Sequence, residues 1–249
     1  MTAFRISMKL AITAPLALAL AACGGDAATD ELEGDVIAPI EAPDGTNWGD
    51  TVNVSESDGY VLGNPEAPIK LVEYASHTCG GCASFSAQAK TSIKEYVATG
   101  VVSFEQRNLV RDPIDLTVAT LVRCGAKENM QVLSDEAWGF LPQIFENVQR
   151  NQAAYETAGA APIEQRFAGI AQAAGLIDFF AARGLSADQQ LACLTDTATI
   201  QAIADNSAAQ GEELNITATP TFLLNDRKLD PLGWEDLEAT LQRAGARQE

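Results

Sequence analysis

The chain has 249 residues, and roughly the last 200 of them suit one domain that carries an insertion. Acidic residues outnumber basic residues by 34 to 16, which gives a formal net charge of -18. A charge of this sign argues against nucleic acid as a partner and against direct binding to a bare anionic membrane.

The first residues form an export signal. Arg5 and Lys9 precede an apolar run, Leu10 to Ala22, which is too short to span a membrane comfortably and is typical of a signal peptide. The run ends in Leu20-Ala21-Ala22-Cys23-Gly24, which resembles the lipobox of bacterial lipoproteins. The resemblance implies cleavage before Cys23 and lipid attachment to its sulfur. The alternative is an ordinary Ala-rich cleavage site with an incidental cysteine.

An acidic segment follows the signal. The chain has no Lys or Arg between Lys9 and Lys70, whereas Asp and Glu accumulate between Gly24 and Ser55. Few large apolar residues interrupt them, so the segment cannot bury enough surface to fold alone. It predicts an acidic disordered tether over residues 23–55, long enough to hold a domain just off a membrane.

A strand, a helix and a second strand come next. Val52 to Leu62 predicts a first short strand, and Ile69 to Ala75 predicts a buried strand. A Pro-free helix follows over Ala83 to Tyr96, with Gly100 as a C-cap. Val101 to Arg107 alternates in part and predicts the next strand. This order makes a right-handed βαβ unit with parallel strands.

Two cysteines stand between the first strand and the helix of this unit, in Cys79-Gly80-Gly81-Cys82. Cys79 would lie at the helix N-terminus, where free N–H groups and the helix dipole favour a thiolate, the attacking species in disulfide exchange. A half zinc site is the alternative, but zinc needs four ligands and the only nearby addition is His77, the sole histidine. The pattern therefore favours redox chemistry.

Residues 112 to 214 are nearly all helical in pattern, and the aromatic residues among them, including Trp138, Phe140 and Phe145, are typical of a core. Helices are predicted at Asp115–Glu128, Ser134–Arg150, Ile163–Ala174 and Leu176–Ala182, with a further helix that starts at a capping box at Ser186 and carries Cys193. A loop, a proline-headed strand and a turn follow over Ile216 to Asp226, and Trp234 to Arg243 forms a last helix.

The remaining cysteines can be assigned by counting. Five cysteines leave one odd, and lipidation of Cys23 would remove it. An exported chain meets an oxidising compartment, so Cys124 and Cys193 are candidates for a structural disulfide. Two buried free cysteines are the alternative.

Several of these motifs together resemble the DsbA-like branch of the thioredoxin fold. They are Gly63-Asn64-Pro65-Glu66-Ala67-Pro68, the strand into Cys79-Gly80-Gly81-Cys82, the helical insertion, and Thr219-Pro220-Thr221-Phe222. The resemblance covers roughly residues 55 to 245. It implies an α/β fold, a thioredoxin domain with an inserted α-helical domain. We expect the signal peptide at 1–22, the tether at 23–55, the thioredoxin domain at 56–111 and 215–249, and the insertion at 112–214.

The resemblance also implies roles for individual residues. Cys79 matches the exposed nucleophile and Cys82 the buried resolving cysteine. Pro220 matches a cis-proline that faces the disulfide, with Thr219 presenting its backbone to substrate. Glu73 falls where the family places a buried carboxylate beneath the resolving cysteine, where a raised pKa would let it relay a proton. An exposed surface Glu is the alternative, because strand alternation alone cannot decide.

One departure from the family pattern concerns the dipeptide between the cysteines. Many periplasmic members have Pro-His, whose histidine stabilises the thiolate, whereas this chain has Gly80-Gly81. The protein is therefore expected to be a weaker oxidant than the strongest members unless His77 substitutes. A surface or partly packed histidine is the alternative for His77.

The sequence predicts a periplasmic thiol-disulfide oxidoreductase, most simply an oxidase, exported and lipid-anchored to a bacterial membrane. Its expected partners are exported proteins with thiols or disulfides and a membrane redox partner that recycles the Cys79–Cys82 pair; it needs no metal or organic cofactor and is expected to be a monomer. The alternatives are a disulfide isomerase or reductase, and a tethered binding or chaperone-like module whose cysteines are merely structural.

Overall fold

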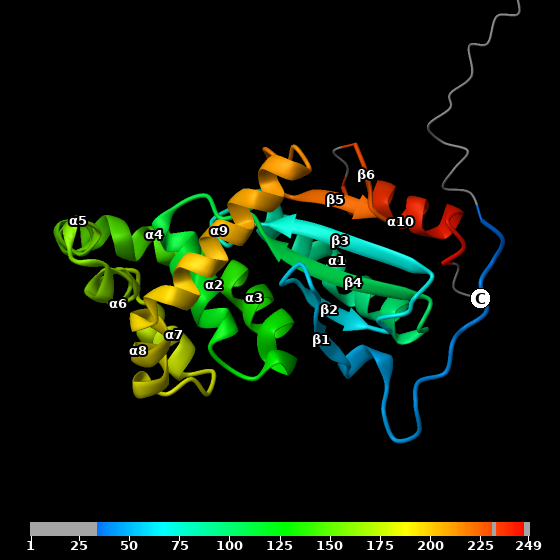
Figure 1. The fold of residues 1–249 in the computed structure, drawn as a ribbon, viewed down its shortest axis with the longest axis horizontal. Coiled ribbons are helices and arrows are strands. Elements are labelled where there is room, and N and C mark those ends of the chain that lie inside the picture. The colour runs from blue at the N-terminus through cyan, green and yellow to red at the C-terminus, as the bar shows by residue number, and fades with distance from the viewer. Residues whose placement is uncertain (1–33, 231–232, 247–249) are drawn as a thin grey trace, which may run out of the picture. The chain divides into compact units, whose positions relative to one another are not determined.

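The computed structural model describes residues 34–230 and 233–246 (Figure 1). The expected export signal and Cys23 lie outside the described residues. The strands are β1 (Val52–Val54), β2 (Tyr60–Gly63), β3 (Ile69–Ala75), β4 (Val102–Asn108), β5 (Thr221–Leu224) and β6 (Arg227–Lys228). The α-helices are α1 (Gly80–Ala98), α2 (Pro113–Arg123), α3 (Met130–Gly139), α4 (Leu141–Arg150), α5 (Gln152–Ala160), α6 (Ile163–Ala173), α7 (Leu176–Ala181), α8 (Ala187–Thr195), α9 (Thr197–Glu213) and α10 (Trp234–Arg243), with short 3-10 helices η2 (Trp48–Asp50) and η3 (Lys127–Asn129).

One mixed sheet, ordered β1-β2-β4-β3-β5-β6, forms the centre of the fold. The neighbours β3 and β4 are parallel and α1 connects them, which is the βαβ unit that the sequence predicts. All other neighbouring pairs are antiparallel. The predicted first strand between Val52 and Leu62 is a hairpin of two strands, because Asp58 takes a left-handed conformation at φ 58° in the turn between them.

The sheet is covered on both faces. On one face, α1 and α10 contribute buried apolar side chains such as Ile93, Val97 and Leu237, which pack with Leu71 and Phe222 of the sheet. On the other face, Val72, Tyr74 and Leu223 form a smaller cluster with Ile216. Burial on both faces explains why β3 is apolar at nearly every position instead of alternating.

The helices between β4 and β5 have a core of their own. Side chains of α2, α3, α6 and α7 meet there, including the fully buried Leu121, Ile170 and Phe180. A disulfide between Cys124, which follows α2, and Cys193 of α8 links two of these helical segments, with Cα atoms 5.9 Å apart. The boundaries of the expected insertion at residues 112 and 214 stay a prediction.

Residues 34–54 correct the expectation of a disordered tether that reaches residue 55. The backbone N–H groups of Gly34 and Ile40 donate to the carbonyl oxygens of Arg243 and Thr99, at 2.9 and 2.8 Å. Val52 is buried in the sheet core. The acidic composition did not indicate this packing. A few apolar side chains are enough to order such a segment when they pack on a domain that is already folded.

Two expectations about the helices are wrong in detail. The helix predicted over Ser134–Arg150 is divided into α3 and α4 around Phe140, because Pro142 has no N–H to donate and suits the first turn of a new helix. Phe145 is not a core residue, since 47% of it is exposed.

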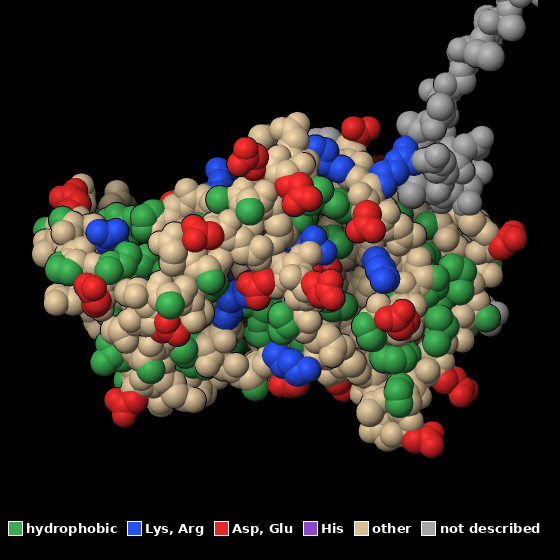
Figure 2. All heavy atoms as spheres, viewed as in Figure 1, with side chains coloured by type: hydrophobic (Ala, Val, Ile, Leu, Met, Phe, Trp, Pro, Cys, Tyr) green, Lys and Arg blue, Asp and Glu red, His purple; other side chains and the backbone are tan. Residues whose placement is uncertain are grey.

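Acidic side chains are scattered over the face shown in Figure 2 and do not gather into one patch. Within the described ranges, no helix has the length and apolar character that crossing a membrane requires.

Candidate active site

The turn between β3 and α1 fixes the position of Cys79. Its backbone N–H donates to the carbonyl oxygen of Ser76 at 3.2 Å, and Cys79 then serves as the N-cap of α1 in an extended conformation. As N-cap, its sulfur accepts a hydrogen bond from the backbone N–H of Cys82 at 3.3 Å. The helix start therefore directs free N–H groups and the positive end of its dipole at this sulfur.

A loop distant in sequence lies against the same sulfur. The Thr219–Pro220 peptide bond is cis, and the Cys79 thiol donates to the Thr219 carbonyl oxygen at 3.2 Å. A Cβ added to Gly81 would lie 3.3 Å from Pro220 Cδ, so Gly81 leaves room for this close approach. The structure thus brings together Cys79, Cys82, Thr219 and Pro220, which the sequence singled out.

The surroundings of Cys79 favour its thiolate. Burial raises the pKa of the Cys79 thiol, but hydrogen bonding from Thr219 and from the backbone N–H groups of Cys82 and Gly81 outweighs burial and holds the pKa below its ordinary value. Such an environment produces a reactive cysteine.

Cys79 is less accessible than the expectation of an exposed nucleophile implied, since only 5% of it is exposed. Its sulfur lies between the start of α1 and the loop at Thr219. The exposed groups beside it are the backbones of Gly80 and Gly81. A substrate must therefore approach across these glycines and the partly exposed Pro220.

Cys82 lies deeper, with no exposed surface, in a cluster with Ala75, Cys79 and Trp138. Burial, and next the charge of Glu73, raise the pKa of the Cys82 thiol. Both cysteines are free thiols in this structure. Because the pKa of Cys79 is lowered and that of Cys82 is raised, Cys79 is suited to attack as a thiolate and Cys82 keeps its proton.

Glu73 is a buried carboxyl, which rules out the exposed alternative. It is 2% exposed, and its Oε1 atom has no hydrogen-bond partner among the described residues. Burial, followed by the charges of Asp135 and Cys79, raises the pKa of Glu73 to about 8. A carboxyl with this pKa can either hold or accept a proton near neutral pH.

His77 is also buried, at 1% exposure, which rules out the alternative of a surface or partly packed residue. Its Nε2 atom shares a hydrogen bond with Ser134 Oγ at 3.1 Å, and its ring stacks on Trp138 with centroids 5.3 Å apart. Its backbone N–H donates to Asp115 Oδ1 at 2.8 Å. These contacts direct the ring toward α3, and no described contact joins it to the sulfur of Cys79.

Two residues of α3 belong to the site and were not assigned to it from the sequence. Trp138 was expected only as a core residue, yet it belongs to the same buried cluster as Cys79 and Cys82. Asp135 was not singled out at all, and it acts electrostatically on Glu73. The two residues lie three positions apart on one face of α3, but nothing in the sequence indicates that this face covers α1.

Within the described residues, no group of three or more His, Cys, Asp or Glu side chains is arranged to hold a metal ion. The chemistry that the site can perform rests on its two thiols, the Glu73 carboxyl and the cis-proline loop. The two thiols differ in pKa, lie at the start of a helix and face a cis-proline loop. This arrangement defines a protein that carries out thiol–disulfide exchange.

Comparisons with known proteins agree with this class. A family model described as Thioredoxin matches residues 55–243. Disulfide bond formation protein D of Bacillus subtilis is 22% identical over 185 residues, which cover 74% of this chain and 75% of that protein. The structure of a protein-disulfide isomerase from Novosphingobium aromaticivorans matches with a TM-score of 0.69 and 29% identity, over 74% of this chain and 96% of that one.

The structure of α-DsbA1 from Wolbachia pipientis shares the fold, with a TM-score of 0.60 at 21% identity over 77% of this chain and 94% of that one. The chain belongs to the thioredoxin family, in its DsbA-like branch, and is a thiol-disulfide oxidoreductase. The expected α/β fold, a thioredoxin fold with added helices, is thereby confirmed.

Proposed function

We propose that this protein is an oxidase that donates the Cys79–Cys82 disulfide to exported proteins in the periplasm. The observation that carries the proposal is the position of the Cys79 sulfur at the start of α1, where it accepts from the backbone N–H of Cys82 and has a pKa below its ordinary value. A stabilised thiolate favours the reduced enzyme, and an enzyme stabilised in its reduced form is a stronger oxidant of its substrates.

The cycle begins with the oxidised pair. A substrate thiolate attacks the sulfur of Cys79, the Cys79–Cys82 bond breaks, and Cys82 leaves as a thiolate that takes the proton held by Glu73. The second substrate thiol, once deprotonated, attacks its own half of the mixed disulfide and releases Cys79 as a thiolate. The substrate loses two electrons and the enzyme gains them. A membrane redox partner then removes these electrons and restores the disulfide.

In this proposal Pro220 and Thr219 form the surface that binds the substrate, beside the exposed backbones of Gly80 and Gly81. The support is the close approach of the cis-proline loop to Cys79. His77 acts by holding the turn before Cys79 in place, since its contacts are with Asp115, Ser134 and Trp138.

A disulfide isomerase or reductase is the second candidate. The relative from Novosphingobium aromaticivorans is called a protein-disulfide isomerase, and it is 29% identical to this chain. The dipeptide Gly80-Gly81 also supplies no side chain to stabilise the Cys79 thiolate, which favours a less oxidising pair. A passive binding module is the third candidate, in which the thiols do no chemistry.

The reduction potential of the Cys79–Cys82 pair, measured against glutathione, separates the first two candidates. A reduction potential of about -120 mV supports the oxidase, and a potential of about -270 mV, as in thioredoxin, contradicts it. Insulin reduction by the wild type and by Cys79→Ser tests the third candidate. A passive module would show the same rate for both proteins, whereas an oxidoreductase loses its turnover with Cys79.

We further propose that Cys23 carries a lipid that anchors the exported protein to a bacterial membrane. The support is the lipobox-like Leu20-Ala21-Ala22-Cys23-Gly24 directly after the apolar run. Cell fractionation of the wild type and of Cys23→Ser tests it. The wild type should sediment with membranes and the variant should be released with the periplasmic fraction; a wild type found wholly in the soluble fraction would refute the anchor.

A further inference from the structure

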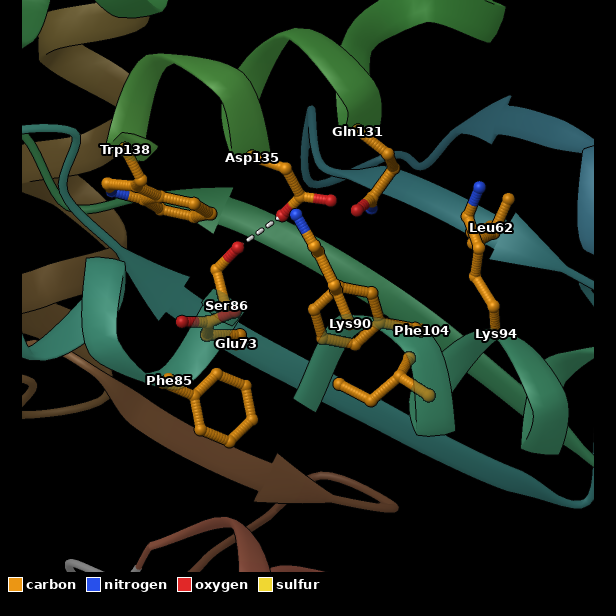
Figure 3. Close-up of a pocket in the computed structure, with 11 residues that line it drawn as sticks. Leu62, Glu73, Phe85, Ser86, Lys90, Lys94, Phe104, Gln131, Asp135 and Trp138 are labelled. Carbon is orange, nitrogen blue, oxygen red and sulfur yellow. Dashed lines mark hydrogen bonds between the residues drawn. The ribbon is translucent and has the colours of Figure 1, made fainter. Parts of the chain in front are cut away.

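A small cavity lies between α1, α3 and the sheet, and Glu73 is one of the residues that line it (Figure 3). Its volume is about 20 Å³, which leaves room for about one water molecule. Its lining includes Glu73 from the sheet, Ser86, Lys90 and Lys94 from α1, and Asp135 and Trp138 from α3. The side chains of Lys90 and Lys94 belong to exposed residues, so the cavity opens toward solvent beside them.

Glu73 needs such an opening. Its carboxyl is 2% exposed, and the Oε1 atom has no hydrogen-bond partner in the described part of the chain. On the side of the cysteines, Cys79, Cys82 and Trp138 form one buried cluster, in which Cys82 has no exposed surface. A proton that Glu73 takes from Cys82 therefore cannot leave past the cysteines while Trp138 stays in place.

Asp135 is the second carboxyl of the cavity. Its Oδ1 accepts a hydrogen bond from Ser86 Oγ at 2.6 Å, and Figure 3 shows these two side chains pointing toward one another from α3 and α1. Burial raises the pKa of Asp135, while the Ser86 hydroxyl, Lys90 and Lys94 lower it and Glu136 raises it. The charge of Asp135 in turn raises the pKa of Glu73, so the two carboxyls are electrostatically coupled.

We propose that Asp135 carries protons between Glu73 and solvent, through one water in the cavity and out beside Lys90 and Lys94. The inference rests on the proposed role of Glu73 in the function above and extends it to α3. Asp135 touches neither sulfur, so it is a positioning residue for the proton and not a catalytic one.

The step that uses this route is the closure of the disulfide during reoxidation. Cys79 is then joined to the oxidant in a mixed disulfide, and the Cys82 thiol gives its proton to the Glu73 carboxylate. The Cys82 thiolate attacks the sulfur of Cys79, the Cys79–Cys82 bond forms, and the oxidant's thiolate leaves with two electrons. Glu73 passes its proton to Asp135 through the water, and Asp135 releases it to solvent.

The test mixes the reduced full chain with glutathione disulfide in a stopped-flow instrument, from pH 5 to 9. The fluorescence of Trp138 and the other tryptophans reports the closure of the Cys79–Cys82 disulfide. The first phase, attack by Cys79, depends on the oxidant concentration, and the second phase, attack by Cys82, does not. Asp135→Asn removes the titrating group but keeps an oxygen that can accept from Ser86. Glu136→Gln, the next residue on α3 but outside the cavity lining, is the matched control for the loss of one charge.

We expect Asp135→Asn to lower the plateau rate of the second phase by roughly tenfold, with the first phase unchanged, and Glu136→Gln to stay within about twofold of the wild type. A profile that moves to lower pH with the same plateau would show that Asp135 acts through its charge alone and would overturn the inference. An equal loss in Glu136→Gln would overturn it as well.

Glu73→Gln separates this inference from the proposed function. If the second phase is unchanged in Glu73→Gln, the proton role of Glu73 itself is wrong. If Glu73→Gln is slow and Asp135→Asn is as fast as the wild type, only the route through Asp135 is wrong. Should Asp135→Asn fail to fold by circular dichroism, Asp135→Ser carries the same expectations.

Discussion

The indole nitrogen of Trp138 donates a hydrogen bond to the carbonyl oxygen of Ser76 at 2.9 Å. This bond joins α3 to the turn that delivers Cys79 to the start of α1, and both partners are buried. The same indole packs on Cys82 and stacks on His77. One side chain therefore holds the turn and covers the resolving cysteine.

Replacing Trp138 should weaken the attachment of the turn before Cys79 and make Cys82 more accessible. Trp138→Phe leaves the Ser76 carbonyl without its partner and opens space beside Cys82, so the free energy of unfolding should fall by about 1–3 kcal/mol. In a Cys79→Ser background, iodoacetamide should alkylate Cys82 faster than when Trp138 is present. Phe145→Leu is the control, because Phe145 is 47% exposed and its replacement should cost less than about 0.5 kcal/mol. Equal alkylation rates with and without the indole would contradict the covering role.

The two glycines between the cysteines should differ in what they tolerate. A Cβ on Gly80 would meet nothing within 4 Å, whereas a Cβ on Gly81 would press on Pro220 Cδ at 3.3 Å. Gly81→Ala should displace the loop from Cys79 and raise the Cys79 pKa toward its ordinary value. Gly80→Ala should leave that pKa unchanged and stabilise the helix start by up to about 0.5 kcal/mol. The thiolate absorbance at 240 nm, followed against pH, measures both; the same pKa in the two variants would refute the distinction.

Glu73 should make the stability of the reduced protein depend on pH. Its folded pKa is about 8 against an ordinary value of 4.5, so the folded state binds more protons between these values. The stability contributed by Glu73 is then fully present below about pH 4.5 and is lost as pH rises through about 8. The slope should approach about 1.4 kcal/mol per pH unit.

Urea unfolding of the reduced wild type and of Glu73→Gln from pH 5 to 8 measures this contribution. Because Cys79 titrates in both proteins, the difference between the two curves isolates Glu73. Glu73→Gln should gain stability relative to the wild type as pH rises. Curves that stay parallel over this range would mean that the Glu73 pKa is not raised.

The Cys124–Cys193 disulfide should contribute substantially to stability. It closes a loop of 69 residues, for which the chain-entropy model gives roughly 4 kcal/mol, and denatured-state structure can reduce this value. The double variant Cys124→Ala and Cys193→Ala should unfold at a markedly lower urea concentration while keeping its Cys79–Cys82 chemistry. Non-reducing peptide mapping should recover the two cysteines in one linked pair. An unchanged unfolding midpoint would argue against the bridge.

The sequence predicts the strand, the helix and the cysteine pair well because each depends on local signals. β3 is a mostly apolar run that contains Lys70 and Glu73, and the helix after it ends just before Gly100, which takes a positive φ of 73°. The hairpin at β1 and β2 and the packing of residues 34–54 depend on contacts with distant elements. No local pattern reports such contacts, so these two features were missed or misjudged.

The active site likewise combines local and distant features. The reactive cysteines belong to a short sequence motif, whereas the groups that shift their pKa values come together through the contact between α1 and α3. Whether Glu73 is buried, whether His77 faces solvent, and that Asp135 stands near Glu73 all follow from that helix packing. Alternation along β3 could not decide the burial of Glu73, because this strand is covered on both faces.

The packing of residues 34–48 fixes where the chain enters the described domain. This segment contacts Thr99 and Gly100 at the C-terminal end of α1, whereas Cys79 caps the N-terminal end of the same helix. A helix of 19 residues is about 28 Å long, so the chain enters the domain at the end remote from the cysteines. If the proposed lipid at Cys23 holds the protein, the point where the described domain is held lies at the end of α1 opposite to Cys79, so the reactive sulfur stays clear of that point.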